Sequence, residues 1–282
     1  MFFSFCQDFL EYSIKKNDKR ASCRLDYIWR NELIRINIIS ENHVAMSHRK
    51  QCIAEWGLSF FLEVEGKNIL FDSGHKGFIA QNAEIMGIDL NRVDYVALSH
   101  YHWDHLEGLL HFEFAEKKKL FLHPDILTKI PVEQKVYLQE KFAVIESQRA
   151  IEISKNVFFL GEIPRVTHFE PGTYKGLPIN DDTALAISTD QGVVVITGCS
   201  HSGICNICEY AKKVTGQKLY AVIGGFHLKE KDTDIVNSTI DYFTKEKPTY
   251  LCPMHCVDFS VLSRFHYEFG SYYYGVGDVF TL

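Results

Sequence analysis

The sequence predicts an α/β fold in which mixed β-sheets pack together and are covered by helices. Residues 58–72 and 183–198 each have the pattern of a β-hairpin, and strand–loop–helix units follow each of them. This repeated order is typical of an α/β sandwich. Four histidines come directly after predicted strands: His100, His201, His227 and His255. Because sites in β–α units form at the carboxyl ends of the strands, these histidines predict one shared site.

The first half of the chain begins with a strand over residues 34–40, where apolar residues alternate and then run together. Residues 58–72 place two apolar strands around the polar turn Glu-Gly-Lys-Asn. Residues 77–88 carry apolar side chains at helical spacing, and Gly87 is a natural end for that helix. Residues 93–99 are expected to form a buried strand that ends where a cluster of histidines begins.

The second half repeats this order. After its hairpin we expect a loop at 199–203, a helix at 204–215, a strand at 219–224, a loop at 225–228, a helix at 232–246, a strand at 249–253 and a loop at 254–256. Both halves are expected to form one domain over residues 33–282. Residues 1–32 carry no clear fold signal and are interpreted as an N-terminal extension.

Composition narrows the class of protein. A chain of 282 residues, 46% of them hydrophobic, can bury a sizeable core. The net charge of −6 and the lack of a basic stripe argue against a nucleic-acid partner, and the lysines at 117–119 are interpreted as a solvated helix end. Gln7 and Asp8 interrupt the apolar start, which argues against a signal peptide or a membrane span. Eight scattered cysteines are typical of a reduced, cytoplasmic protein.

The motif at residues 98–109, "LSHYHWDHLEGL", indicates metal binding, with four donors in six positions: His100, His102, Asp104 and His105. In an extended loop, side chains two residues apart point the same way, so the first two histidines can reach one ion. The aspartate and the third histidine lie past the bend and suit a neighbouring ion. Imidazole with carboxylate fits one or two divalent ions, zinc first, with iron, manganese or magnesium as alternatives.

Each ion also needs ligands from distant parts of the chain. The available donors are the histidines that follow later strands: His201, His227 and His255. Ordinary solvated or core histidines are the competing interpretation. The density of donors directly after an apolar strand makes that interpretation the weaker one for the motif.

Other polar residues near predicted strand ends are candidates for supporting roles. Asp72 follows a strand and is expected to orient a ligand histidine through its second ring nitrogen, or to cap a turn. His123 also ends a strand and is a candidate for substrate contact. Asp181 and Asp182, just before a strand, are interpreted as turn or hairpin residues.

The segment "SHYHWDH" resembles the His-x-His-x-Asp-His signature of the metallo-β-lactamase superfamily, whose αββα sandwich matches the two halves described above. The similarity extends over residues 34–282. One branch of the superfamily, related to archaeal dihydropterin–ribofuranosylaminobenzene phosphate synthase, resembles the segments "GLSFFLEVEGKNILFDSG", "NAEIMGIDLNRVDYVALSH", "VVVITGCSHSGICN" and "YAVIGGFHL".

The resemblance implies a pair of ligands for each ion, His100 with His102 and Asp104 with His105. It also implies that His201 completes one ion's ligand set, and that His227 and His255 compete for the remaining place. Cys199 stands near the position where many relatives carry a bridging aspartate, so it is expected either to ligate as a thiolate or to line the site.

The expected function is that of a metal-dependent hydrolase, which uses a metal-bound hydroxide on an ester, phosphoester or amide. Asp104 and His227 are the expected catalytic residues, with His227 or His255 as proton donor. The alternatives are a transferase that uses a pterin diphosphate and a non-catalytic metal-containing ligand-binding protein. The expected partner is a small-molecule substrate, phosphorylated or pterin-like, with no membrane partner and with a homo-oligomer left open.

Overall fold

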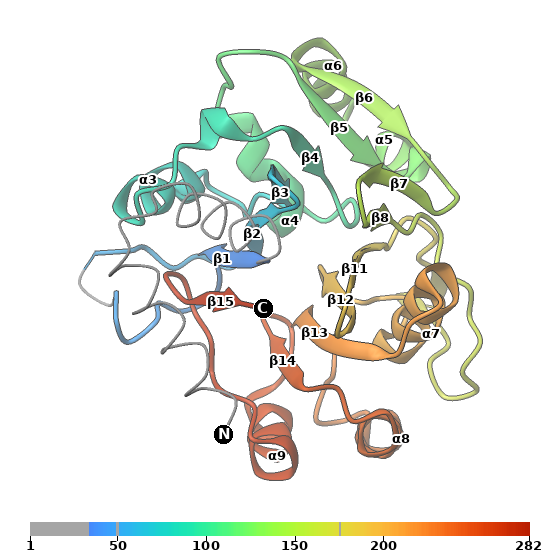
Figure 1. Cartoon of the computed structure of the whole chain (residues 1–282). Coiled ribbons are helices and arrows are strands. Elements are labelled where there is room, and N and C mark those ends of the chain that lie inside the picture. Colours follow the sequence, from blue (N-terminus) through green and yellow to red (C-terminus); the bar gives the residue numbers. More distant parts are fainter. Residues whose placement is uncertain (1–33, 49–50, 175) are drawn as a thin grey trace, which may run out of the picture.

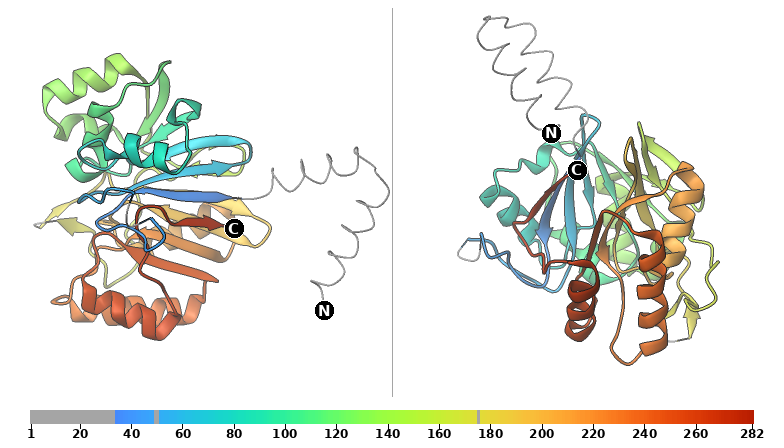
Figure 2. Two further views of the ribbon diagram at one scale, coloured as in Figure 1. Left: turned by 90° about the vertical axis from the view of Figure 1, so that its left-hand side faces the viewer. Right: turned by 60° about the horizontal axis from the view of Figure 1, so that its bottom comes forward.

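The computed structural model describes residues 34–48, 51–174 and 176–282. Within them, two β-sheets pack face to face and helices cover both outer faces (Figures 1 and 2). The first sheet has seven strands: β15 (Val279–Thr281), β1 (Arg35–Ser40), β2 (Ser59–Val64), β3 (Lys67–Phe71), β4 (Tyr95–Ala97), β5 (Lys118–Leu122) and β6 (Phe142–Glu146), in this spatial order. Strands β15 to β3 pair antiparallel, and β3 to β6 pair parallel.

The second sheet has six strands in the described residues and repeats this change of direction. Its order is β14 (Tyr250–Met254), β13 (Leu219–Gly225), β12 (Gly192–Thr197), β11 (Ala184–Thr189), β8 (Val157–Phe159) and β7 (Ile151–Ser154). Strands β7, β8, β11 and β12 pair antiparallel, whereas β12, β13 and β14 are parallel. A short hairpin of β9 (Thr173–Tyr174) and β10 (Leu177–Pro178) stands apart from both sheets.

Helices form the two outer layers, above and below the sheets in the left view of Figure 2. The first sheet is covered by α3 (Phe78–Ile85), η1 (Leu90–Arg92), α4 (Trp103–Leu106), η2 (Glu107–His111), α5 (Pro124–Lys129) and α6 (Val132–Lys141). The second sheet is covered by α7 (Ile204–Thr215), α8 (Thr233–Glu246) and α9 (Phe259–Phe269). The predicted αββα sandwich is therefore confirmed.

Three apolar clusters hold these layers together. The cluster between the two sheets includes Phe60, Phe71 and Phe159, all fully buried. One cluster lies between each sheet and its own helices. A strand buried on both faces needs apolar side chains on both, and β12, "GVVVIT", is buried at every position.

Several elements differ from the sequence-based expectations. The interpretation of Lys117–Lys119 as a helix end was wrong, because β5 begins at Lys118. Residues 1–32, interpreted as an extension, lie outside the described residues. In the part of the chain that the structure describes, no helix has the length and apolar character needed to cross a bilayer.

The fold brings several loops to one edge of the sandwich. Strands β3, β4 and β5 of the first sheet are parallel, as are β12, β13 and β14 of the second, so the carboxyl ends within each group lie on the same side. The predicted donors follow β4, β12, β13 and β14. This is the arrangement in which α/β folds place their sites.

Candidate metal centre

The histidine motif spans the join between β4 and a helix. His100 lies in the loop after β4, and His102 is the N-cap residue of α4 with extended backbone angles. Asp104 and His105 belong to the single turn of α4. The change from extended to helical backbone therefore divides the four donors into two pairs that point in different directions.

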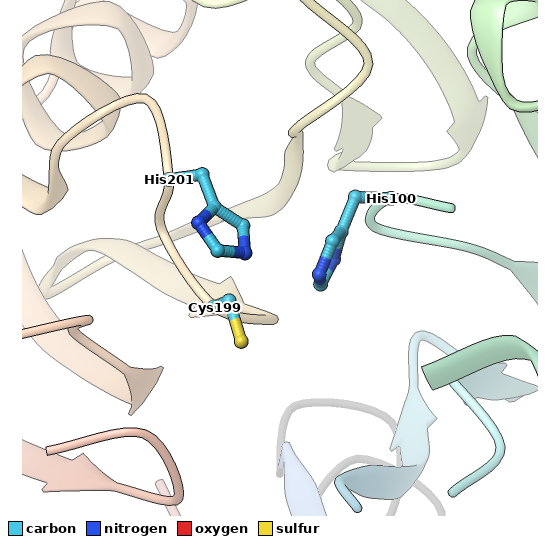
Figure 3. A group of neighbouring side chains, drawn as sticks. All are labelled: His100, Cys199 and His201. Carbon is cyan, nitrogen blue, oxygen red and sulfur yellow. The ribbon is translucent and has the colours of Figure 1, made fainter. Parts of the chain in front are cut away.

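The first donor group consists of His100, Cys199 and His201, whose ligand atoms lie within 4.8 Å of one another. In Figure 3 the two imidazoles come from separate loops, with the Cys199 sulfur beside them. His102 joins this group, because its Nδ1 lies 3.1 Å from His201 Nε2. Three imidazoles and one thiol form a donor set that suits zinc and other borderline divalent metals.

The second donor group consists of His105, Cys199 and His255, again within 4.8 Å. His105 Nε2 lies 3.2 Å from Cys199 Sγ. Asp104 completes the group, because its Oδ2 is 3.3 Å from His255 Nε2 and 3.9 Å from His105 Nε2. Cys199 is therefore common to both groups and lies between them.

Neighbouring polar groups orient the ring of three of these histidines. Asp72 Oδ2 lies 2.7 Å from His105 Nδ1 and accepts a hydrogen bond from Ser99 Oγ, which is itself 2.9 Å from His100 Nδ1. Asn42 Oδ1 lies 3.0 Å from His255 Nδ1. When the Nδ1 atom is held from outside, Nε2 is directed toward the centre of the site, as in many metal-binding histidines.

The residues present fit divalent ions. Among the described residues, His100 Nε2 and His255 Nε2 are buried without a hydrogen-bond partner, and Asp104 Oδ2 lies 3.3 Å from the latter. A buried polar atom without a hydrogen-bond partner costs free energy, and a bound cation would offset that cost. Burial, together with the neighbouring imidazoles, holds the pKa of His100 and His201 well below the ordinary value. Neutral imidazole is the form that binds a metal.

Carboxylates lie beside the second group and make its surroundings more negative than those of the first. Burial lowers the pKa of His105, but Asp72 and Asp104 outweigh it and raise this pKa to about 9. The two carboxylates therefore stabilise a positive charge at this position. Burial, with Cys256 beside it, raises the pKa of the Cys199 thiol well above its usual value. A nearby cation would favour the thiolate form of this cysteine.

His227 and His123 lie outside both donor groups. His227 and His255 were expected to compete for one ligand position, and His255 is the one that belongs to the second group. His227 is half-buried, and its ring centroid lies 4.3 Å from that of His201. The backbone N–H of His227 donates a hydrogen bond to Cys256 Sγ. His123 is buried and caps α5 by accepting a hydrogen bond from the Asp125 backbone N–H.

A cavity of about 610 Å³ adjoins the first donor group. One wall comes from the loop between β13 and α8, with His227, Lys229 and Lys231, and the other from residues 170–173. His201 lines the same cavity, so a molecule bound there would contact the donor group directly. This is the position expected for a substrate pocket.

Sequence reasoning missed the residues that support the second group. Glu41 Oε1 accepts a hydrogen bond of 2.7 Å from the His255 backbone N–H, and Asn42 Nδ2 donates to His255 O at 2.7 Å. Both residues directly follow β1, as the donor histidines follow their own strands. Their position directly after a strand was the sequence signal that could have identified these two residues as part of the site.

Three comparisons place this chain among known proteins. The family model of the metallo-beta-lactamase superfamily matches residues 57–214. The chain is 32% identical over 253 residues to the 7,8-dihydropterin-6-methyl-4-(beta-D-ribofuranosyl)-aminobenzene-5'-phosphate synthase of Methanocaldococcus jannaschii, covering 77% of this chain and 85% of that protein. It is 31% identical to an uncharacterized protein of the same organism, covering 80% of this chain and 93% of the relative.

Among solved structures, the chain resembles Tm1679, described as a metal-dependent hydrolase of the beta-lactamase superfamily. The TM-score is 0.75 and the identity 26%, covering 88% of this chain and 99% of the other. Sequence signature, two-sheet architecture and relatives agree, and this chain belongs to the metallo-β-lactamase superfamily.

Proposed function

We propose that this protein is a metal-dependent hydrolase that acts on an ester, phosphoester or amide bond of a small molecule. The observation that carries the proposal is the pair of donor groups that share Cys199 beside an open cavity. Divalent ions held there would acidify a water molecule and neutralise charge that develops on the substrate. The resemblance to Tm1679, a metal-dependent hydrolase, supports the same class.

The residues of the chain have separate roles in this proposal. Asp104 and the histidines of both groups hold the ions, and the cavity binds the rest of the substrate. His227 belongs to neither group, lines the cavity and lies beside His201, so it is placed to give a proton to the leaving group. Lys229 and Lys231 line the same cavity, together with Glu170 and Asp232. Lys229 Nζ pairs with Asp258 Oδ1 at 3.5 Å, so we assign contact with a phosphate of the substrate to Lys231.

A second candidate is a transferase that releases diphosphate from a pterin diphosphate. The observation that favours it is the 32% identity to the methanogen synthase. In that reaction the amine nitrogen of the aminobenzene would replace water as the attacking group. It would lose a proton as the bond from the pterin methyl carbon to the diphosphate oxygen breaks, and the same cavity would hold the diphosphate. The two candidates differ in the acceptor and can be separated by product analysis.

The test compares metal content and turnover in matched variants. Purified wild-type protein loaded with Zn²⁺ should bind about two ions and hydrolyse bis(p-nitrophenyl) phosphate or a p-nitrophenyl ester. His102→Ala should lower both Zn²⁺ content and turnover. His227→Ala should keep the Zn²⁺ content. On an alkyl phosphoester, whose leaving alcohol needs a proton, it should lower kcat roughly 100-fold or more, the range for loss of a general acid. On the p-nitrophenyl substrate, whose leaving group departs as a stable anion, it should change kcat far less.

Unchanged Zn²⁺ content in His102→Ala would remove His102 from the ligands, and wild-type protein that binds no Zn²⁺ would refute the metal centre. Release of diphosphate from a pterin diphosphate only when an aminobenzene ribotide is present would instead establish the transferase.

A further inference from the structure

Two adjacent carboxylates precede β11, Asp181 and Asp182, and the proposed chemistry does not use them. Both side chains are fully buried. An aspartate in a turn is ordinarily at the surface, where water solvates its charge. Burying a carboxylate costs free energy unless hydrogen bonds or an ion pair offset it. The partners of these carboxylates therefore indicate what they hold in place.

Asp181 holds the loop that carries the first two histidines of the motif. Its Oδ2 accepts a hydrogen bond of 2.9 Å from the backbone N–H of Tyr101, the residue between those histidines. Its Oδ1 forms an ion pair with Lys129 Nζ at 2.5 Å. Thr183 N–H donates to Ser99 O at 2.9 Å, so the same short segment contacts this loop twice.

Asp182 holds the loop that follows β12. Its Oδ2 accepts a hydrogen bond of 2.9 Å from the backbone N–H of Ser202 and a second from the Ser202 hydroxyl. Ser202 directly follows His201, and Cys199 belongs to the same loop. Two consecutive residues thus hold two loops that come from different sheets.

The second donor group has different supports. His105 is oriented by Asp72, and His255 by Asn42 and Glu41. Among the described residues, no hydrogen bond joins Asp181 or Asp182 to a donor that belongs to the second group alone. The two groups therefore share Cys199, and Asp72 supports both, at His105 directly and at His100 through Ser99. Asp181 and Asp182 instead hold the two loops that carry the residues of the first group.

We propose that Asp181 and Asp182 are positioning residues that fix the spacing between the His100–His102 loop and the His201 loop, and so determine the ion affinity of the first donor group selectively. The inference rests on the metal centre of the proposed function. The short backbone contacts explain why it is selective: loss of either carboxylate releases one loop of the first group and leaves the supports of His105 and His255 intact.

The experiment places Asp182→Ala in two backgrounds and measures the dissociation constant of Zn²⁺ by chelator competition. His255→Ala leaves the first group's own ligands intact, and His102→Ala leaves those of the second. Asp182→Ala should weaken Zn²⁺ binding about 10- to 100-fold in the first background, the range for outer-shell partners of a metal. It should weaken binding less in the second background, where Cys199 is the one ligand that the released loop carries. Asn42→Ala should give the opposite pattern.

Asp182→Asn is the conservative control, because its amide oxygen can still accept from Ser202 N–H, and it should restore most of the affinity. If Asp182→Ala does not fold, Ser202→Ala removes the hydroxyl contact alone and should weaken the first group in the same direction. Equal weakening in both backgrounds, or none in either, would overturn the positioning role while the metal centre stands. If the protein bound no Zn²⁺ in either background, the metal centre itself would be overturned as well.

Discussion

At the scale of single residues, Cys199 has the most demanding position in the candidate site. Its sulfur belongs to both donor groups, and it is nearly fully buried. A thiolate there would contribute one negative charge to two cations, as a bridging carboxylate does. The resemblance implied that Cys199 stands near a bridging aspartate of many relatives, so a ligand or a residue lining the site was expected. The Cys199 sulfur lies within 4.8 Å of the ligand atoms of both groups.

Cys199→Ala should therefore weaken Zn²⁺ binding at both positions, whereas His102→Ala or His255→Ala should weaken mainly one. Titration of each variant with Zn²⁺, with the bound fraction followed by chelator competition, measures this difference. Cys208→Ala is the matched control, because Cys208 is also buried but lies on α7, in the core between that helix and its sheet. A Cys199 variant with the wild-type affinity at both positions would show that the sulfur merely lines the site.

At the scale of elements, the strand ends hold the site at some cost in backbone strain. Among the described residues, seven non-glycine residues have positive φ, and four of these lie at the site: Asp72, Ser200, His227 and His255. Such residues cost roughly 1–3 kcal/mol each and persist where the surrounding structure fixes them. Three of them lie in loops that follow parallel strands β12, β13 and β14, and Asp72 directly follows β3. The strain is thus concentrated where the loops must turn side chains inward.

The close approach of the β12 loop to the β4 loop requires a glycine at position 198. A Cβ there would lie 2.1 Å from Ser99 Oγ and 2.9 Å from Asp72 Oδ2. Gly198→Ala should therefore displace Ser99 from its place between Asp72 and His100, lower Zn²⁺ affinity about 10-fold or more and destabilise the fold by roughly 1–3 kcal/mol. Zinc titration together with chemical unfolding measures both effects.

Gly66 supplies the control for this prediction. It has positive φ, +71°, which Gly198 does not, and a Cβ there would meet nothing within 4 Å. Gly66→Ala should cost about 1–2 kcal/mol of stability from its backbone conformation and leave Zn²⁺ affinity unchanged. If both variants lost stability equally and neither lost affinity, the close contact at Gly198 would have no role in the site.

At the scale of the whole molecule, the candidate metal centre joins the two sheets. The first donor group combines residues that follow β4 of one sheet with residues that follow β12 of the other, and the second adds His255 after β14. An ion bound by both sheets binds the folded chain and not the unfolded one. Its binding free energy therefore adds to the free energy of unfolding.

Zn²⁺ should accordingly raise the thermal unfolding temperature, and a chelator should lower it again. An excess of free Zn²⁺ about 100-fold above the dissociation constant corresponds to about 2.7 kcal/mol for one site. For a domain of this size that is a shift of several degrees. Differential scanning calorimetry measures the shift, which should be much smaller in Cys199→Ala. The same shift in that variant would point to Zn²⁺ binding elsewhere.

The sequence by itself determined the layers and most of the donors. Hydrophobic periodicity is a local property, so the hairpins at 58–72 and 183–198, the helix at 204–215 and the later strands could be predicted closely. The position of His100, His201 and His255 after strands was also local information. Elements between residues 118 and 182 were largely missed, because their short strands and helices give weak patterns.

Only the tertiary structure decided how the donors are grouped. His105 and Cys199 are 94 residues apart in the chain, and Asn42 and His255 are 213 apart. The sequence could not show that Cys199 lies between both groups, that His255 rather than His227 joins the second, or that Asp181 and Asp182 hold two loops instead of forming a simple turn. Such distances depend on how the two sheets pack against each other, and that packing is set by the whole apolar core rather than by any local motif.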